Sequence, residues 1–423
     1  MLAVTRENTR HFHGFRVART ETAKAFVAQV IDRLLAWEAE HYPRTRRRKD
    51  ADLRQFHAQV EALVTDLIHR ELTCPGEFIA VTLHSLDAAD RYRAPVLTDS
   101  IRHVLTLLEE AGFIGVVKGN NRDGWRSSVS TALWWTVDLP GIGLDDLGEA
   151  PQEVIYLRGA RQWTDPQKTG KKPEKRRAEN LQYRDTAQTR AWRQTMQSIN
   201  DWLAIAHIEV ESGAVNDEGT EIDVNQRALY RVFTDKWTQG GRMYGAFWVN
   251  MPKAERFRSI RIGGKRPVEV DYKQAHPTML YGEAGVPIPT DSYAIPGIPL
   301  DCREDVKALF NAMLNARSEL NRYPTGIKPI AGLSCTKAVA RIKDYHAPIA
   351  SAFQTGKGLQ LQRKESDIVI DVLLALRGKG IVALPIHDAL LVAEGTEDIA
   401  SQVMQEVFRD RLGFDAKVEL RYS

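Results

Sequence analysis

The sequence predicts an α+β protein with more than one domain, and three observations support this prediction. The chain has 423 residues, which is more than one compact core usually accommodates. Apolar residues recur at helical spacing between residues 20 and 72. Two apolar stretches, residues 267–271 and 380–394, have the composition of strands, and each contains an aspartate where the apolar run ends or is interrupted.

The composition is that of an ordinary globular protein. Hydrophobic residues make up 43% of the chain and charged residues 27%, and no apolar run approaches the roughly 20 residues of a membrane span. The basic N-terminus lacks the apolar segment of a secretory signal, and the three cysteines show no metal-ligand spacing. We therefore expect a cytoplasmic protein with no membrane partner, disulfide or zinc site. The net charge of +3 is too small to indicate a nucleic-acid partner by itself.

Residues 1–150 form the first predicted domain, which is mainly helical. Residues 20–72 predict helices separated by one loop that contains a basic run. Another helix is predicted over residues 101–111, and residues 113–137 then predict a strand, a polar basic turn and a returning strand. The order helix, strand, turn, strand resembles a winged helix, which implies DNA binding. Trp134 and Trp135 are expected in the core rather than on a base-stacking surface.

Two linkers follow, one rich in Gly, Pro and Asp at residues 138–152 and one basic at residues 164–180. The basic stretch is either a solvated linker, which is the simpler interpretation, or an arm that follows a phosphate backbone. Residues 185–208 predict a further helix. The second domain, 151–239, is therefore expected to combine a basic linker with a helical region.

Asp271 lies at a predicted corner between a strand and a helix. Residues 267–271 have the pattern of a short strand, and residues 275–281 can begin a helix. A carboxylate at such a corner is well placed to bind an ion. The simpler alternative is that Asp271 caps the following helix.

Asp388 follows His387 at the predicted turn of an apolar hairpin. In two-metal phosphoryl transfer, carboxylates from neighbouring strands bridge two divalent ions about 4 Å apart. Asp271 and Asp388 at adjacent strand ends would meet this requirement. An HD-type phosphohydrolase uses the same His-Asp pair, but within helices, so the strand-turn-strand setting argues against that alternative.

The region from Gly240 to Ser423, the third predicted domain (240–423), resembles the palm and fingers of family A DNA polymerases, a group that includes the single-subunit phage-type RNA polymerases. Four elements occur in the order of that family. They are the Gly-Arg loop at Arg242 with the Asn-x-Pro stretch at Asn250, the first metal motif Asp271-Tyr272, the Arg-x-x-x-Lys helix with Arg303 and Lys307, and the second metal motif His387-Asp388. The resemblance implies a palm with an antiparallel sheet, helical fingers and a thumb-like role for residues 151–239.

The resemblance also implies roles for individual residues. Arg303 and Lys307 are four residues apart, so they share a helix face and would direct two cations at one triphosphate. Two Mg²⁺ ions, or Mn²⁺ in their place, would be held by Asp271, Asp388 and the backbone of Tyr272, with Lys307 also assisting catalysis. His276, Phe310 and Asn311 are expected at the nucleotide, and Arg242, Asn250, Gln362, Arg363 and His387 on the nucleic acid.

Two departures from the family pattern leave the choice of sugar open. Family A DNA polymerases usually carry a glutamate five residues after the first aspartate, where it closes off the space for a ribose 2′-hydroxyl, and this chain has His276 there. Ala389 stands where many DNA polymerases place a second acid. This leaves two metal carboxylates, as in the phage-type RNA polymerases. The sequence Asp-Tyr-x-x-x-His-Pro-Thr is also similar to the first motif of family B polymerases.

These residues predict a DNA polymerase that extends a primer, with DNA primer-template and nucleoside triphosphates as partners. The predicted pairing with a winged helix is typical of a replication protein of a plasmid, phage or other mobile element. An RNA polymerase or primase is the alternative within the same class. A non-catalytic DNA-binding initiator is the alternative from another class, although the two aspartates argue against it. The sequence does not indicate an oligomeric state, and for His84 and His346 a surface or packed position is favoured.

Overall fold

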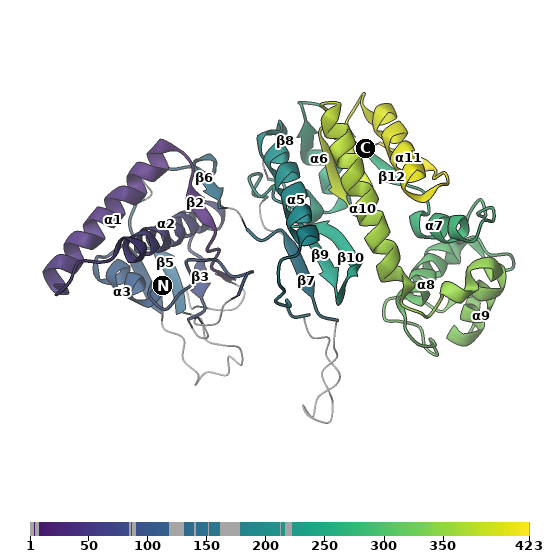
Figure 1. The fold of residues 1–423 in the computed structure, drawn as a ribbon, viewed down its shortest axis with the longest axis horizontal. Helices are drawn as coiled ribbons and strands as arrows, with labels where there is room; N and C mark the ends of the chain where they lie inside the picture. Colours follow the sequence, from purple (N-terminus) through teal and green to yellow (C-terminus); the bar gives the residue numbers. More distant parts are fainter. Residues whose placement is uncertain are drawn as a thin grey trace. The chain divides into compact units, whose positions relative to one another are not determined.

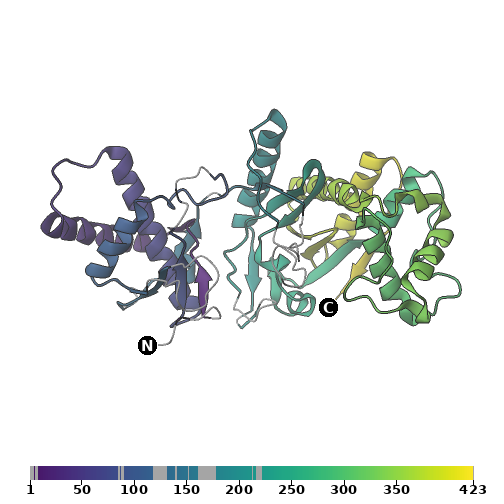
Figure 2. The same ribbon diagram turned by 90° about the horizontal axis from the view of Figure 1, so that it is seen from below.

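The computed structural model describes residues 4, 8–83, 86, 90–117, 131–138, 141–150, 152–160, 178–211, 213–215 and 222–422. The chain divides into two compact units, Met1–Glu153 and Val154–Ser423 (Figures 1 and 2). Each unit has its own hydrophobic core and combines helices with small sheets, in agreement with the expected α+β class. Within the described residues, no helix has the length and apolarity that a membrane crossing requires.

Three helices form much of the first unit. They are α1 (Glu21–His41), α2 (Asp50–Thr73) and α3 (Ile101–Glu110), close to the predicted ranges. Thr20 begins α1, because its side chain accepts a hydrogen bond from a backbone amide of the first turn. Gly112 follows α3 with φ of +77°, a conformation that glycine adopts without strain and that ends helices.

The first unit also contains more strand than the sequence predicted. Its four-stranded sheet has the order β1 (Thr9–His11), β3 (Phe78–Val81), β5 (Thr131–Trp135), β4 (Ile114–Val117). The expectation of a mainly helical domain was therefore incomplete, because β1 and β3 are only 3 and 4 residues long and give no clear alternation. Trp135 is buried, as expected, whereas Trp134 is only half-buried.

Part of the predicted linker between the units is structured. β6 (Leu147–Glu149) pairs with β2 (Arg16–Ala18), and the short 3₁₀ turn η1 (Leu144–Asp146) precedes it. The order α3, β4, β5 matches the predicted helix, strand, strand, and the winged-helix interpretation stays a prediction. The basic turn between β4 and β5, His84 and residues 164–177 of the basic linker lie outside the described residues.

The main sheet of the second unit is antiparallel and has four strands. The order is β13 (Ala383–Ile386), β14 (Ala389–Ala393), β12 (Pro267–Tyr272), β15 (Val418–Arg421). The helix α11 (Glu397–Leu412) contacts three of these strands. The Tyr272 hydroxyl donates a hydrogen bond of 2.7 Å to the carbonyl of Met404 in α11, which fixes the end of β12 against that helix.

Helix α10 (Lys357–Gly378) is central to the second unit (Figure 1). Its 22 residues span about 33 Å. One face buries Leu361, Ile368 and Val372, which are at most 1% exposed, and the helix contacts β10, α11 and α8. This helix therefore joins elements that lie far apart in the sequence.

Residues 154–239 belong to the same core as residues 240–423, rather than forming a separate helical region. Met196, Ile199 and Leu203 of α5 (Ala187–Ile205) are fully buried in that core. The remaining strands form two small sheets, β10 (Lys236–Tyr244), β9 (Tyr230–Thr234), β7 (Ile155–Arg158) and β11 (Ile260–Ile262), β8 (Ile208–Val210). The other helices in the described residues of this unit are α6 (Lys253–Ser259), α7 (Ala275–Glu283), α8 (Arg303–Asn315) and α9 (Cys335–Tyr345). The 3₁₀ turns there are η2 (Phe247–Val249), η3 (Leu300–Cys302), η4 (Ile330–Gly332) and η5 (Ala347–Ala352).

Candidate active site

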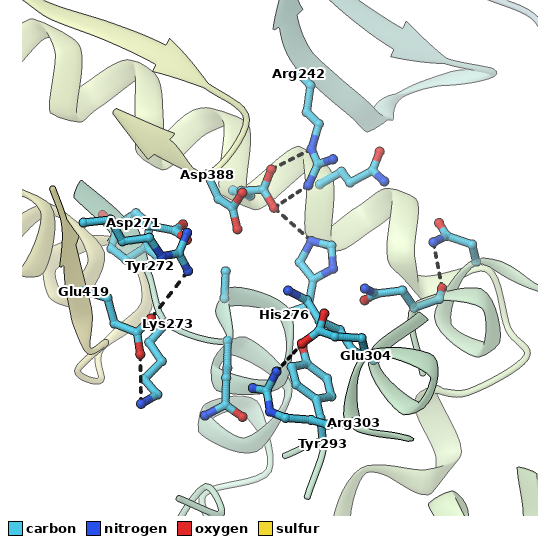
Figure 3. A pocket seen from close by; sticks show the side chains of 18 residues that line it. Arg242, Asp271, Tyr272, Lys273, His276, Tyr293, Arg303, Glu304, Asp388 and Glu419 are labelled. Carbon is cyan, nitrogen blue, oxygen red and sulfur yellow. Dashed lines mark hydrogen bonds and ion pairs between the residues drawn. The ribbon is translucent and has the colours of Figure 1, made fainter. Parts of the chain in front are cut away.

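A pocket of about 700 Å³ in the second unit brings together most of the residues predicted from the sequence (Figure 3). Its walls come from β10, β12, the first turn of α7, one face of α8 along its length, the polar part of α10, the β13–β14 turn and the strand β15. The predicted residues that line it are Arg242, Asp271, Tyr272, His276, Arg303, Lys307, Asn311, Gln362 and Asp388.

Asp271 and Asp388 lie on neighbouring strands. In the pairing of β12 with β14, Asp271 is opposite Ala389, so Asp388 immediately precedes the residue that faces Asp271. His387 adopts a left-handed conformation with φ of +60°, which non-glycine residues seldom adopt, and it makes the tight turn between β13 and β14. As a result, both carboxylates line the same pocket (Figure 3).

At both aspartates, burial raises the pKa more than the nearby positive charges lower it. Burial, with repulsion from Glu365 and Asp271, raises the pKa of Asp388 to about 7. Burial also raises the pKa of Asp271, although the Arg421 guanidinium opposes this rise. Two adjacent carboxylates with raised pKa values are stabilised in their ionised form by added positive charge.

The donor set fits magnesium. Among the described residues, no cluster of three or more His, Cys, Asp or Glu side chains has the geometry of a metal centre. Mg²⁺ commonly uses only one or two protein carboxylates and completes its shell with water and substrate phosphates. Asp271 and Asp388 line the same pocket and could supply these carboxylates.

Strand β15 adds a cation that the sequence analysis missed. Arg421 lies opposite Glu269 in the β12–β15 pairing, and its Nη1 is 2.9 Å from the Asp271 carboxylate and 2.8 Å from that of Glu269. Lys253 also binds Glu269, at 2.6 Å. No local sequence pattern identifies Arg421, because its place depends on pairing between strands about 150 residues apart.

The opposite wall of the pocket is cationic. Arg303 and Lys307 lie one turn apart on α8, as predicted. Arg303 already binds two carboxylates, Asp291 at 2.7 Å and Glu304 at 2.5 Å. Lys307 has no carboxylate within ion-pair distance in the described part of the chain, so its charge is available to a ligand.

Tyr293 is a second pocket residue that the sequence analysis missed. The Arg303 guanidinium and the Lys307 ammonium lie 5.4 and 6.0 Å from the centre of its ring. Burial raises the pKa of Tyr293, so it remains a neutral phenol. The loop that carries it is fixed by His346, which is fully buried and whose Nε2 lies 2.8 Å from the carbonyl oxygen of Ser292.

Glu365 also lines the pocket and was not predicted either. Arg242 donates two hydrogen bonds to its carboxylate, of 2.7 and 2.9 Å, and Nε2 of His276 lies 2.9 Å from the same carboxylate (Figure 3). Burial acts to raise the pKa of Glu365, but His276 and Arg242 lower it to about 2. Glu365 is therefore ionised, although it is only 1% exposed.

Four predicted residues do not line the pocket. Asn250 is exposed beyond η2. Arg363 projects from another face of α10, because consecutive helical residues are about 100° apart, and it donates to the carbonyl of Trp237. His387 packs edge-on against Tyr244, and its Nδ1 is buried without a hydrogen-bond partner among the described residues. The fourth, Phe310, is fully buried.

Phe310 belongs to the core, and its replacement tests this position. The ring packs edge-on against Tyr293 and Phe353, so we expect Phe310→Ala to lower the free energy of unfolding by about 3–5 kcal/mol. Phe310→Leu retains most of the buried volume and should cost less. Urea unfolding of both variants measures the two costs. A loss below about 1 kcal/mol in Phe310→Ala would contradict the core assignment.

No family model matches the chain, and no curated protein matches it. Among solved structures, the chain is similar to the POL domain of Pol1 from M. smegmatis, solved in complex with DNA primer-template and dNTP. The TM-score is 0.33 and the identity 16%, over 50% of this chain and 49% of that chain. The chain thus spans about half the length of that polymerase domain, and a likeness at this level carries no inference about activity.

Proposed function

We propose that the chain is a nucleotidyltransferase that extends the 3′-hydroxyl of a nucleic-acid strand along a template. The observation that supports this function is the position of Asp271 and Asp388, which share one pocket with the cationic pair Arg303 and Lys307. Phosphoryl transfer needs carboxylates that hold divalent ions and cations that neutralise the triphosphate, and both sets are present here.

Each residue of the site has a role in this proposal. Asp271 and Asp388 would hold two Mg²⁺ or Mn²⁺ ions, and such ions would supply activation of the attacking oxygen and stabilisation of the leaving group. Lys307, which has no carboxylate partner in the described ranges, and Arg303 bind the triphosphate and lower the charge on the departing pyrophosphate. Arg242 lies across the pocket, where the primer end would enter.

The finer assignment to a DNA polymerase rests on the order of motifs between Gly240 and Ser423. We propose deoxynucleotides as substrates and a primed DNA template as partner. The predicted pairing of this region with a winged helix, rather than a motif, is the basis for proposing a role in the replication of a plasmid, phage or other mobile element. Use of ribonucleotides by an RNA polymerase or primase is the second candidate, and the observation that favours it is His276, whose imidazole lines the pocket at 12% side-chain exposure.

A primer-extension assay tests the proposal. Labelled primer-template is incubated with deoxynucleotides or ribonucleotides and with Mg²⁺ or Mn²⁺. We expect extension by the wild-type protein and a loss of at least about 10³-fold in Asp271→Ala and Asp388→Ala. Asp415→Ala is the matched control, because Asp415 is an exposed acid that does not line the pocket.

The outcomes separate the candidates. Extension that survives both aspartate substitutions would show that these carboxylates do not hold the catalytic ions. Incorporation of ribonucleotides alone would identify an RNA polymerase or primase. Binding of primer-template without incorporation of either sugar would identify a non-catalytic DNA-binding protein.

A further inference from the structure

Glu365 connects two groups that reach the pocket from different parts of the chain. Arg242 comes from β10 and His276 from the first turn of α7, while Glu365 itself lies in the middle of α10. Both partners line the pocket, and both contact the same nearly inaccessible carboxylate. Burying a carboxylate is costly unless it is paired, so this group is stable only while the Arg242 guanidinium and the His276 imidazole remain in place.

The backbone of β10 is shaped so that Arg242 reaches Glu365. Gly240 and Gly241 have φ values of +73° and +90°, and the pairing of β10 with β9 shifts register between Gly240 and Arg242. Such a bulge redirects the next side chain. A Cβ atom at Gly241 would lie 3.0 Å from the Arg231 guanidinium, so a larger residue would disturb this approach.

A second set of contacts fixes the bulge on α10. The carbonyl of Gly241 accepts hydrogen bonds from Ser366, the neighbour of Glu365 on α10, and from Arg231 at 2.9 Å. Arg231 is 1% exposed and also binds Asp367 on the same helix, at 2.9 Å. Arg242 is thus held at both its backbone and its guanidinium before any ligand binds.

His276 joins this group to the segment that carries Asp271. His276 follows Asp271 by five residues, and the chain between them turns at Gln274, with φ of +55°, from β12 into α7. The contact of its Nε2 with Glu365 therefore connects α10 to the strand end that carries a proposed metal ligand.

We propose that Glu365 is a positioning residue that holds Arg242 and His276 as one preformed unit between the primer side and the nucleotide side of the site. This proposal rests on the proposed function. An ionised carboxylate can accept both hydrogen bonds of the forked Arg242 guanidinium and still lie 2.9 Å from the His276 ring nitrogen. The amide of a glutamine has a single oxygen, and its NH₂ group faces a donor, so Glu365→Gln keeps the shape but loses one of the contacts.

The first measurement compares Glu365→Gln with Glu283→Gln. Glu283 is the matched control, because it also joins α7 to α10, through Lys357 at 3.2 Å and Lys364, but it does not line the pocket. We expect Glu365→Gln to lower kcat/KM for primer extension by about 10²-fold, the size of effect that misplaced binding groups produce. Glu283→Gln should stay within about twofold of wild type, since surface ion pairs contribute little.

A double-mutant cycle separates positioning from a general structural role. If Glu365 acts through Arg242 and His276, Glu365→Gln costs less activity in the Arg242→Ala background than in the wild-type protein, because one of the two positioned groups is already absent. Effects that multiply in the double variant would overturn the proposal. Glu365→Asp, which retains the charge on a shorter side chain, should recover part of the activity.

A readout without catalysis keeps the proposal testable if the proposed function fails. The chain has 11 histidines, and ¹⁵N-histidine labelling gives the His276 imidazole a resonance that is assigned by its loss in His276→Asn. This resonance should shift in Glu365→Gln and stay unchanged in Glu283→Gln. An unchanged resonance in folded Glu365→Gln would overturn the proposal, whereas wild-type protein that extends no primer would refute only the function. If Glu365→Gln does not fold, Arg242→Ala is measured in its place, and an unchanged His276 resonance there overturns the proposed unit.

Discussion

Asp388→Asn is expected to abolish primer extension and, at the same time, to stabilise the metal-free protein above pH 7. The pKa of Asp388 is about 7 in the folded protein and about 3.8 in the unfolded chain. Below pH 4 the group is protonated in both states and has no effect. Between pH 4 and pH 7 the unfolded chain releases the proton while the folded protein retains it, so the wild-type protein loses stability as pH rises.

The wild-type protein loses up to about 4 kcal/mol of folding stability above pH 7, where it holds an ionised carboxylate near Glu365 and Asp271. Asparagine has no charge to bury, so the variant avoids this cost. Thermal unfolding in EDTA between pH 4 and pH 8.5 measures the effect. We expect the melting temperature of Asp388→Asn to exceed that of wild type at pH 8, with the difference shrinking toward pH 4.

Asp415→Asn is the control for this experiment, because its carboxylate is exposed and outside the pocket. It should show no gain that grows with pH. If Asp388→Asn is less stable than wild type at pH 8, the ionised Asp388 carboxylate does not destabilise the metal-free protein, which would contradict this prediction. Added Mg²⁺ should stabilise wild type more at pH 8 than at pH 6, because metal binding requires the ionised form.

Lys307→Ala is expected to raise the KM for nucleoside triphosphates, with the second largest effect on activity. Lys307 has no carboxylate partner among the described residues, whereas Arg303 shares its charge with Asp291 and Glu304. A hydrogen bond to a charged group contributes about 1.5–3 kcal/mol, so its removal should lower kcat/KM by about 10- to 150-fold. Arg303→Ala should cost less nucleotide affinity, because part of its charge is already neutralised.

Steady-state kinetics with varied nucleotide and fixed primer-template measure this difference. Lys337→Ala is the matched control, since Lys337 is an exposed lysine on α9 that does not line the pocket. If Lys307→Ala leaves kcat/KM for the nucleotide unchanged, or lowers it no more than Lys337→Ala, α8 does not bind the triphosphate.

The parts of the site that depend on local sequence could be predicted. The corner after Asp271, the turn at Asp388 and the helix with Arg303 and Lys307 each arise from a short pattern of apolar residues, turn residues and spacing. The pairing of the strands that carry Asp271 and Asp388 could also be predicted, because the order of the motifs implied that they belong to one sheet. Each of these features involves residues within one or two elements.

The parts that depend on distant pairing could not be predicted. In the sequence, Glu365 is one charged residue among others in a polar helical segment. Its contacts with Arg242 and His276 depend on how β10 and α7 pack against α10. Arg421 became relevant only through the register of β15 against β12. Helical spacing placed Phe310 and Asn311 together, but which of them faces the core depends on the packing of α8, and only Asn311 faces the pocket.

The central claim is that Asp271 and Asp388 jointly hold the ions for nucleotidyl transfer, and counting bound Mn²⁺ by electron paramagnetic resonance tests it most directly. The measurement uses the full chain with primer-template and a non-hydrolysable triphosphate, compared with free triphosphate alone. We predict two protein-dependent Mn²⁺ ions in the wild-type complex and in Asp415→Asn, and at most one in Asp271→Asn and in Asp388→Asn. Two ions retained in both variants of the paired aspartates would contradict the claim.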